Sequence, residues 1–298
     1  MTTAPIVLFV YNRPWHTRQT VEALARNPLA PESDLLVYSD AARTAAAAEA
    51  VGEVRAYLKT IRGFRSVQVT EREENLGVAR SVIAGVSDAI GKFGEAIVVE
   101  DDLVTSPHFL GYMNDALRLY RDVEEVVSIH GYLYPVAQTL PESFFLKGAD
   151  CWGWATWKRG WDLFEPDGRK LQAALAARKL ERRFEFNGTY PYCRLLEDQI
   201  AGRNDSWAIR WYASALLHDR LTLYPGRSLV HNIGNDLSGT HCDNVRCYDT
   251  EMSSRPISLA PLPPEEDRFA LHAFECYFRK IRPSRCQRLL ARLAGVFR

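Results

Sequence analysis

Three adjacent carboxylates, Glu100, Asp101 and Asp102, directly follow the apolar run "AIVV" at residues 96–99. Charges of the same sign repel at this spacing, and each carboxylate prefers water to a protein interior. A positive group should therefore meet them, and carboxylate oxygens are ligands that suit Mg²⁺ and Mn²⁺. The alternative is a solvated strand end before a helix, because "TSPHF" at 105–109 has the form of a helix N-cap.

Strands and helices alternate in the pattern of the first hundred residues. Strands are predicted at 5–11, 34–40, 65–73 and 95–102, with helices between them at 13–27, 41–61 and 77–93. This alternation predicts an α/β fold with a mostly parallel, Rossmann-like central sheet flanked by helices. Ligands bind at the carboxyl ends of such strands. The polar groups there should converge on one crevice: Asn12 and Arg13, Ser39 and Asp40, Glu73 to Asn75, and the three acids.

The pattern changes after residue 110. We predict a helix at 106–122, strands at 126–132 and 143–148, mostly helical structure at 168–203 and a strand pair at 220–234. The predicted division of the chain is a nucleotide-binding half (1–110), an acceptor-binding and catalytic half of the same domain (111–250) and a C-terminal extension (251–298).

The composition of the 298 residues indicates a globular protein, with 47% hydrophobic and 25% charged residues. Lys plus Arg equals Asp plus Glu at 37 each, which argues against general nucleic-acid binding. The chain contains no apolar run of 18 residues, and its N-terminus lacks a basic signal-peptide region. Its six cysteines include no C-x2-C pair, so we expect free thiols and a cytoplasmic protein.

Six stretches, in chain order, resemble motifs of nucleotide-sugar glycosyltransferases of the GT-A fold. The resemblance is greatest to the group that contains N-acetylglucosaminyltransferase I and bacterial surface-polysaccharide enzymes. It covers roughly residues 5–245, and the order of the motifs carries it more than any one of them. The stretches are "LFVYNRP", "VYSD", "VVEDDLVTSPHF", "CWGWATWKRGW", "NDSW" and "HNIGNDLSGTHC".

The resemblance implies a metal-dependent donor site. Asp102, together with His231, would hold Mn²⁺ or Mg²⁺ against the diphosphate of the donor, a use of the metal as a Lewis acid. The residues that would bind the nucleotide or the donor sugar are Asn12, Arg13, Asp40, Asn75, Arg80, Glu100, Asp101, Trp152, Gly153, Trp154 and His241.

The catalytic base implied by the resemblance is Asp205 in "NDSW". A base of this kind takes the proton from the acceptor hydroxyl. The sequence departs from the family pattern at Ser206, where the family has a second Asp. Asp198 and Glu197, on a predicted helix, are the rival carboxylates.

Four tryptophans lie between residues 152 and 161. Trp154, Trp157 and Trp161 have the i, i+3, i+7 spacing of one helix face, and we predict this core role for the last two. A glycine between two indoles suits a tight loop near a ligand, so we predict that Trp152 or Trp154 contacts a sugar.

The C-terminal segment is basic and amphipathic. Leucines and a phenylalanine share one face, beside three arginines, which predicts either a helix at an anionic membrane surface or one docked on the protein. The residues are Leu289, Leu290, Leu293, Phe297, Arg285, Arg288 and Arg292.

These features together predict an inverting glycosyltransferase of the hexosyltransferase class. The resemblance implies a UDP-sugar donor such as UDP-GlcNAc, and a glycan or lipid-linked glycan acceptor in surface polysaccharide synthesis. A sugar-nucleotide nucleotidyltransferase is the first alternative, but the Gly-rich basic loop typical of that class is missing from "LFVYNRPWHTRQ". A non-catalytic sugar-binding module is the second, and the candidate base and metal ligands argue against it.

Overall fold

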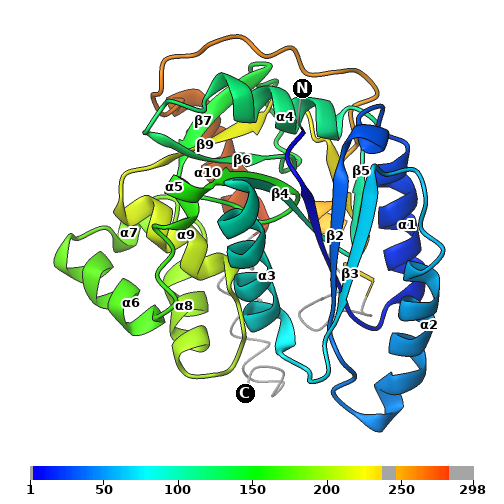
Figure 1. Ribbon diagram of the computed structural model, residues 1–298. Coiled ribbons are helices and arrows are strands. Elements are labelled where there is room, and N and C mark those ends of the chain that lie inside the picture. The colour runs from blue at the N-terminus through cyan, green and yellow to red at the C-terminus, as the bar shows by residue number, and fades with distance from the viewer. Residues whose placement is uncertain (1–2, 237–245, 282–298) are drawn as a thin grey trace.

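The computed structural model describes residues 3–236 and 246–281 of the chain (Figure 1). The strands are β1 (Ile6–Val10), β2 (Asp34–Ser39), β3 (Ser66–Glu71), β4 (Glu95–Glu100), β5 (Leu103–Thr105), β6 (Val126–His130), β7 (Ser143–Lys147), β8 (Trp154–Trp157), β9 (Leu221–Pro225) and β10 (Val230–Asn232). The helices are α1 (Pro14–Ala25), α2 (Ala48–Leu58), α3 (Gly77–Phe93), α4 (Phe109–Leu119), α5 (Lys158–Trp161), α6 (Gly168–Ala177), α7 (Glu181–Phe184), α8 (Tyr192–Ile200), α9 (Ala208–Leu217) and α10 (Arg268–Ile281).

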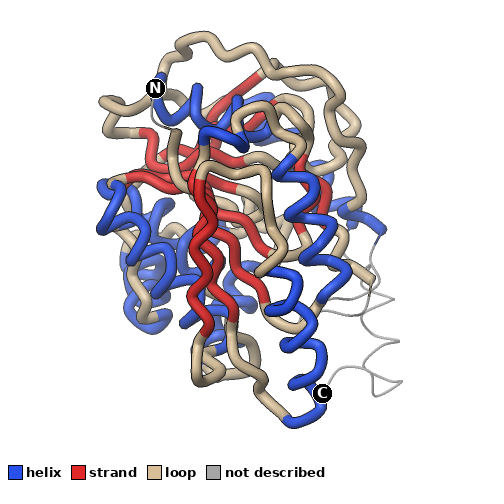
Figure 2. The backbone as a smooth tube through the Cα atoms, turned by 45° about the vertical axis from the view of Figure 1, so that its right-hand side comes forward, coloured by secondary structure: helices blue, strands red, loops and turns tan. Residues whose placement is uncertain are grey.

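One eight-stranded sheet with the order β3-β2-β1-β4-β8-β6-β9-β7 runs through the molecule (Figure 2). Its first four strands are parallel neighbours, and β8 then joins β4 in the antiparallel direction. Strands β6 and β9 are also parallel, so four of the seven strand pairings in this sheet are parallel. The mixed α/β fold with a mostly parallel, helix-flanked sheet is therefore the predicted one. Because β4 pairs with β8, the predicted halves 1–110 and 111–250 share this sheet.

Strand β1 is buried on both faces, which explains its uninterrupted apolar sequence. Ile6, Leu8 and Val10 belong to the core cluster that also contains side chains of α1, α2 and α4. Val7 and Phe9 point the other way, into the cluster with α3 and α9. Figure 1 shows α1 and α2 on one side of these strands and α3 on the other. With both faces covered, the strand ends are where polar groups can gather.

Two predictions for the second half of the chain are wrong. The predicted strand pair at 220–234 does not form, because β9 pairs with β6 and β7 while β10 pairs with β5. The predicted helix face of tryptophans is also absent, since Trp154 and Trp157 lie on strand β8. Trp157 and Trp161 are nevertheless buried, so their predicted core role is confirmed.

No helix in the part of the chain that the structure describes is long and apolar enough to cross a membrane. The C-terminal segment at 285–297, for which we predict a surface helix, lies outside the described residues. Four cysteines are described, all as free thiols: Cys151, Cys193, Cys247 and Cys276.

Candidate active site

The positive group that meets the acidic cluster is the guanidinium of Arg13. Arg13 follows β1, and its Nη2 lies 2.6 Å from Oδ1 of Asp101 and 2.8 Å from Oδ2 of Asp102. Because β1 and β4 are parallel neighbours, their carboxyl ends lie side by side. Arg13 therefore contacts Asp101 and Asp102, although they lie 88 and 89 positions further along the sequence. The backbone N–H of Tyr11 also donates to Asp101, over 3.4 Å. The strand ends of β1 and β4 thus form one charged unit.

One guanidinium does not balance three carboxylates. Burial, followed by the charges of Asp102 and Asp101, raises the pKa of Glu100 to about 8. Burial also raises the pKa of Asp101, although Arg13 opposes the shift. Burial disfavours the charge of Arg13 itself, but the two aspartates outweigh it and its pKa rises. The raised pKa values of Glu100 and Asp101 reflect burial and repulsion among the acids, which a bound cation would relieve.

The donor set fits a hard divalent ion. Within the described residues, the Glu100 side chain and Oδ1 of Asp102 accept no hydrogen bond, and Nη1 of Arg13 is a buried donor without a partner. No three His, Cys, Asp or Glu side chains at 3–236 and 246–281 are grouped to hold an ion by themselves. Mg²⁺ is commonly held by one or two carboxylates and completed by substrate phosphates. Asp102 is suited to that arrangement, and Nη1 of Arg13 to a phosphate oxygen.

Asp40 follows β2 and caps helix α3. Its Oδ1 accepts from the backbone N–H of Ala41 and Leu76, over 3.0 and 2.9 Å, and its Oδ2 accepts from Gly77 over 3.0 Å. Carboxylates are favourable at helix N-termini, where backbone N–H groups lack partners within the helix. Asp40 is buried, so its contacts are structural, and its predicted role toward the nucleotide stays a prediction.

Replacing Asp40 with alanine is expected to lower the free energy of unfolding by about 1–3 kcal/mol, because buried N–H groups lose their acceptor. Urea unfolding followed by circular dichroism measures this. Asp162→Ala is the matched control, because Asp162 is exposed and, among the described residues, its side chain pairs only with Lys158, one turn away. Unchanged stability of Asp40→Ala would contradict the capping role.

The candidate base Asp205 lies at the same helix N-terminus. Its Oδ2 accepts from the backbone N–H of Ala79 over 3.3 Å, so a residue 126 positions away reaches the start of α3. A Cβ on Gly77 would lie 3.3 Å from that oxygen, and Gly77 has a φ of +74°, which favours glycine. Asp205 is exposed, and Ser206 next to it accepts from the N–H of Ile209 at the start of α9. Ser206 therefore has a capping role where the motif has an acid.

The rival carboxylate Asp198 is engaged elsewhere. Its Oδ1 accepts from Nε of Arg203 over 2.7 Å, and Arg194 lies one helical turn away on α8. These are surface ion pairs of a helix, which favour the structural interpretation of Asp198 over the catalytic one.

Three further predicted donor-site residues surround the start of α3 and the end of β1. Asn75 donates from Nδ2 to the carbonyl of Ala41 over 2.6 Å, which joins the loop before α3 to the end of β2. The side chains of Asn12 and Arg80 make no hydrogen bond or ion pair with any described residue, and Arg80 is exposed. Both side chains are therefore available to a ligand at this edge.

The segment after β10 lies against Asp102. The N–H of Ile233 donates to the carbonyl of Asp102 over 2.8 Å, and a Cβ on Gly234 would lie 2.2 Å from its Oδ2. Only glycine permits this approach, a constraint that the sequence pattern did not reveal. His231 pairs with Val104 in the β5–β10 ladder, two residues from Asp102, and its metal role stays a prediction. His241 lies outside the described residues.

The two tryptophans on either side of Gly153 have different surroundings. Trp154 is 0% exposed and packs on Trp161, Trp207 and Trp211, so the prediction that it contacts a sugar is corrected. Trp152 is half-buried and remains available. Gly153 between them has a φ of +69°, and a Cβ there would lie 2.8 Å from Val230, so glycine is required for the turn.

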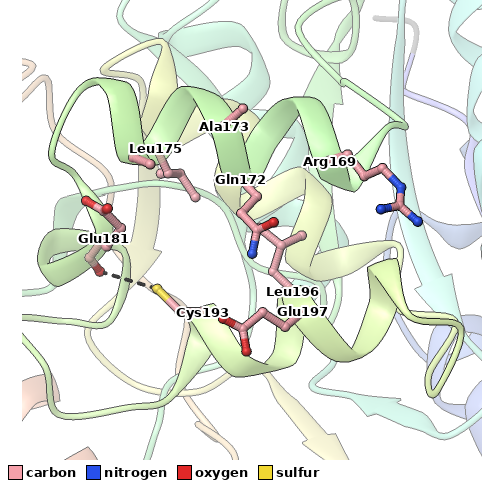
Figure 3. A pocket seen from close by; sticks show the side chains of 9 residues that line it. Arg169, Gln172, Ala173, Leu175, Glu181, Cys193, Leu196 and Glu197 are labelled. Carbon is pink, nitrogen blue, oxygen red and sulfur yellow. Dashed lines mark hydrogen bonds between the residues drawn. The ribbon is translucent and has the colours of Figure 1, made fainter.

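A separate groove of about 440 Å³ lies between α6, α7 and α8 (Figure 3). It is lined by Gln172, Cys193 and the rival carboxylate Glu197, among others, and by no other candidate site residue that the structure describes. Burial, followed by nearby glutamates, raises the pKa of Cys193 to about 12, so its thiol stays protonated and is a weak nucleophile. The groove is therefore not part of the site at the strand ends.

Comparison with known proteins places the chain in no family. No protein-family model matches it, and no curated protein matches it. Among solved structures, a crystal structure of S. aureus TarS matches with a TM-score of 0.34 and 15% sequence identity. The match covers 49% of this chain and 24% of that one, so the chain spans about a quarter of its length.

Proposed function

We propose that this protein is a metal-dependent, inverting glycosyltransferase that uses a nucleotide diphosphate sugar. The observation that supports it most is the Arg13 bridge to Asp101 and Asp102, at the carboxyl ends of parallel central strands. It brings a phosphate-binding side chain and a candidate metal ligand to the edge where such sheets bind nucleotides. The order of the six motifs supports the same function.

In this proposal the diphosphate lies against Arg13, whose free Nη1 faces an oxyanion. Asp102 would hold Mn²⁺ or Mg²⁺, which supplies neutralisation of the leaving diphosphate, with His231 as a second candidate ligand. Asn12, Asn75 and Arg80 would contact the nucleotide, and Glu100 and Asp101 hydroxyls of the ribose or the donor sugar. Asp40 holds the start of α3, next to Asn75 and Arg80, through the backbone N–H groups of Leu76 and Gly77.

Asp205 takes the proton in the transfer step. The acceptor oxygen forms a bond to the anomeric carbon while the bond from that carbon to the diphosphate oxygen breaks on the opposite side. The proton of the acceptor hydroxyl passes to a carboxylate oxygen of Asp205, and the nucleoside diphosphate leaves with the bonding electrons. A single displacement of this kind inverts the configuration at the anomeric carbon.

The motif resemblance supports further details of the proposal. It favours a UDP-sugar, with UDP-GlcNAc first, and an acceptor that is a glycan or a lipid-linked glycan of a bacterial surface polysaccharide. An acceptor of that kind would bring the protein to the cytoplasmic face of the membrane.

A donor panel tests the proposal. UDP-, GDP-, dTDP- and CMP-sugars are incubated with the protein in Mn²⁺ or in EDTA, and release of free nucleotide and thermal shifts are measured. We expect one nucleotide class to stabilise the protein in Mn²⁺ and to be hydrolysed slowly, with both effects lost in EDTA. If no nucleotide sugar binds under either condition, the proposed function is wrong.

A further inference from the structure

A second carboxylate, Asp150, lies among aromatic rings in the loop that leads into β8. Its Oδ2 accepts from the Tyr134 hydroxyl over 3.1 Å, and its Oδ1 from the Cys151 N–H over 2.8 Å. The Tyr224 hydroxyl and the Cys151 thiol also lie against it. The Asp150 side chain is 17% exposed, so most of it is covered and one part remains accessible.

Asp150 has no cation among the residues at 3–236 and 246–281. Its nearest basic group is Nδ1 of His130, 3.9 Å from Oδ2. The N–H of Trp152 donates to Nε2 of His130 over 3.1 Å, so the neutral ring carries its proton on Nδ1. Burial lowers the pKa of His130, more than Asp150 raises it, and keeps the ring neutral. Nδ1 is buried, and no hydrogen bond of ordinary geometry joins it to a described residue.

A largely buried carboxylate without a cation is costly in a folded protein. Burial and the charge of Asp150 raise the pKa values of Tyr134 and Tyr224, so these hydroxyls stay neutral donors. They satisfy part of the carboxylate's hydrogen-bonding capacity, and a ligand hydroxyl could satisfy more of it. A carboxylate that is mostly covered and still reaches the surface can accept hydrogen bonds from a ligand.

Half-exposed aromatic side chains stand beside this carboxylate. The ring of Trp152 lies 4.7 Å from that of Tyr132 and 5.6 Å from that of Tyr248, in edge-to-face contacts. The hydroxyls of Tyr190 and Tyr248 lie 3.0 Å apart. Trp152, Tyr190 and Tyr248 are all partly exposed, so each presents aromatic surface next to a hydrogen-bond acceptor.

The position of this group relative to the acidic cluster indicates which part of a donor would face it. Strand β8 is antiparallel to β4 and begins at Trp154, opposite Val98, so the loop that carries Asp150 leads into β8 at the edge where β4 ends in Glu100. Along the sheet, β2 and β1 lie on one side of β4, and β8, β6 and β9 on the other. Asp150 therefore lies across the acidic cluster from the proposed nucleotide side.

We propose that Asp150, with the rings of Trp152, Tyr190 and Tyr248, forms a subsite for a pyranose ring. Aromatic faces pack on the C–H surfaces of a sugar, and the carboxylate accepts from its hydroxyls, so the two together recognise a ring with both kinds of surface. In the proposed function, this ring is that of the donor sugar or that of the acceptor sugar. This assignment of the ring to a substrate rests on the proposed function. Asp150 binds and orients this ring, and the proton still passes to Asp205.

The test uses simple sugars without a nucleotide. Methyl β-glucoside, methyl β-galactoside and methyl N-acetyl-β-glucosaminide are titrated against the full chain by saturation-transfer NMR and tryptophan fluorescence. We expect at least one to bind, and Asp150→Asn to weaken it by about tenfold or more, because the acceptor loses its charge and one of its two acceptor oxygens. Asp162→Asn, at an exposed aspartate, should leave binding unchanged.

Tyr248→Phe keeps the test decisive if Asp150→Asn does not fold. It retains the ring and removes the hydroxyl next to Tyr190, so weaker glycoside binding in a folded Tyr248→Phe protein supports the subsite. Equal affinity of the wild type, a folded Asp150→Asn and Tyr248→Phe for every glycoside would overturn it, as would absence of binding to all three sugars and to the sugar part of a nucleotide sugar.

Two further measurements assign the ring. If Asp150→Asn abolishes the gain in affinity of a UDP-sugar over UDP, the subsite holds the donor sugar; if it raises the acceptor KM at unchanged donor affinity, it holds the acceptor sugar. Failures of the two proposals are distinguishable. Nucleotide binding without a role for Asp150 in sugar binding overturns only the subsite, and Asp150-dependent glycoside binding without nucleotide binding overturns only the transferase.

Discussion

Replacing Asp102 with alanine is expected to remove the Mn²⁺-dependent part of nucleotide binding and to lower transfer by about 100-fold or more. A metal ion that neutralises a leaving diphosphate contributes several kcal/mol to the transition state, and each 1.36 kcal/mol is about tenfold in rate. The fold should survive, because Arg13 keeps its contact with Asp101 at 2.6 Å and the repulsion among the three acids falls. Isothermal titration with UDP, in Mn²⁺ and in EDTA, measures the binding part.

The measurement in EDTA separates the loss of a metal ligand from a general loss of structure, because only a general loss of structure would weaken UDP binding without metal. Without metal, the Asp102 carboxylate repels the diphosphate, so Asp102→Ala should bind UDP in EDTA at least as tightly as the wild type. Asp122→Ala, at an exposed aspartate, is the control. Wild-type Mn²⁺ dependence in Asp102→Ala, or full activity of the wild type in EDTA, would show that Asp102 is not the metal ligand.

The first half of the fold follows from the sequence because strand and helix periods differ clearly there. The apolar runs of β1 and β4 and the helical spacing before Pro28 each permit one interpretation, and the parallel order then places their ends together. The contact of Arg13 with Asp101 and Asp102 confirms that the ends of β1 and β4 meet at one edge.

The tryptophan segment shows where a sequence pattern was ambiguous. The i, i+3, i+7 spacing of Trp154, Trp157 and Trp161 is compatible with a helix face, yet a four-residue strand followed by one helical turn buries the same side chains. Periodicity cannot separate these cases over so short a run. Burial of Trp157 and Trp161 could be predicted, but the burial of Trp154 on a strand could not.

Charge compensation at the site could be predicted only in part. The sequence indicates that a positive group should meet the three acids, but the pairing with Arg13 depends on strand order across 88 residues. Asp150 gave no signal, because "KGAD" matches no motif. Its surroundings come from His130, Tyr134 and Tyr224 on separate segments. Features assembled from distant segments require the structure.

The position of Asp205 in the structure sharpens the prediction for the base. Its Oδ2 is tied to the N–H of Ala79, and the residue is exposed, so a carboxylate oxygen is held in a fixed place at the start of α3. Asn retains an oxygen that can accept the same bond, so Asp205→Asn should keep the fold and the geometry. What it loses is the capacity to take a proton.

General-base assistance is worth about 10²–10⁴-fold in rate, so we expect Asp205→Asn to lose at least about 100-fold in transfer. Nucleotide-sugar affinity should remain nearly unchanged, because the proposed role of Asp205 is to take a proton and not to bind the donor, and such a split marks a group that acts in the transition state. Asp198→Asn is the matched control on a nearby helix, and its ion pair with Arg203 predicts a mild effect. Transfer rates and donor dissociation constants are measured for both variants on the same substrates. An inactive Asp198→Asn beside an active Asp205→Asn would reassign the base to α8, and two active variants would exclude a carboxylate base in this segment.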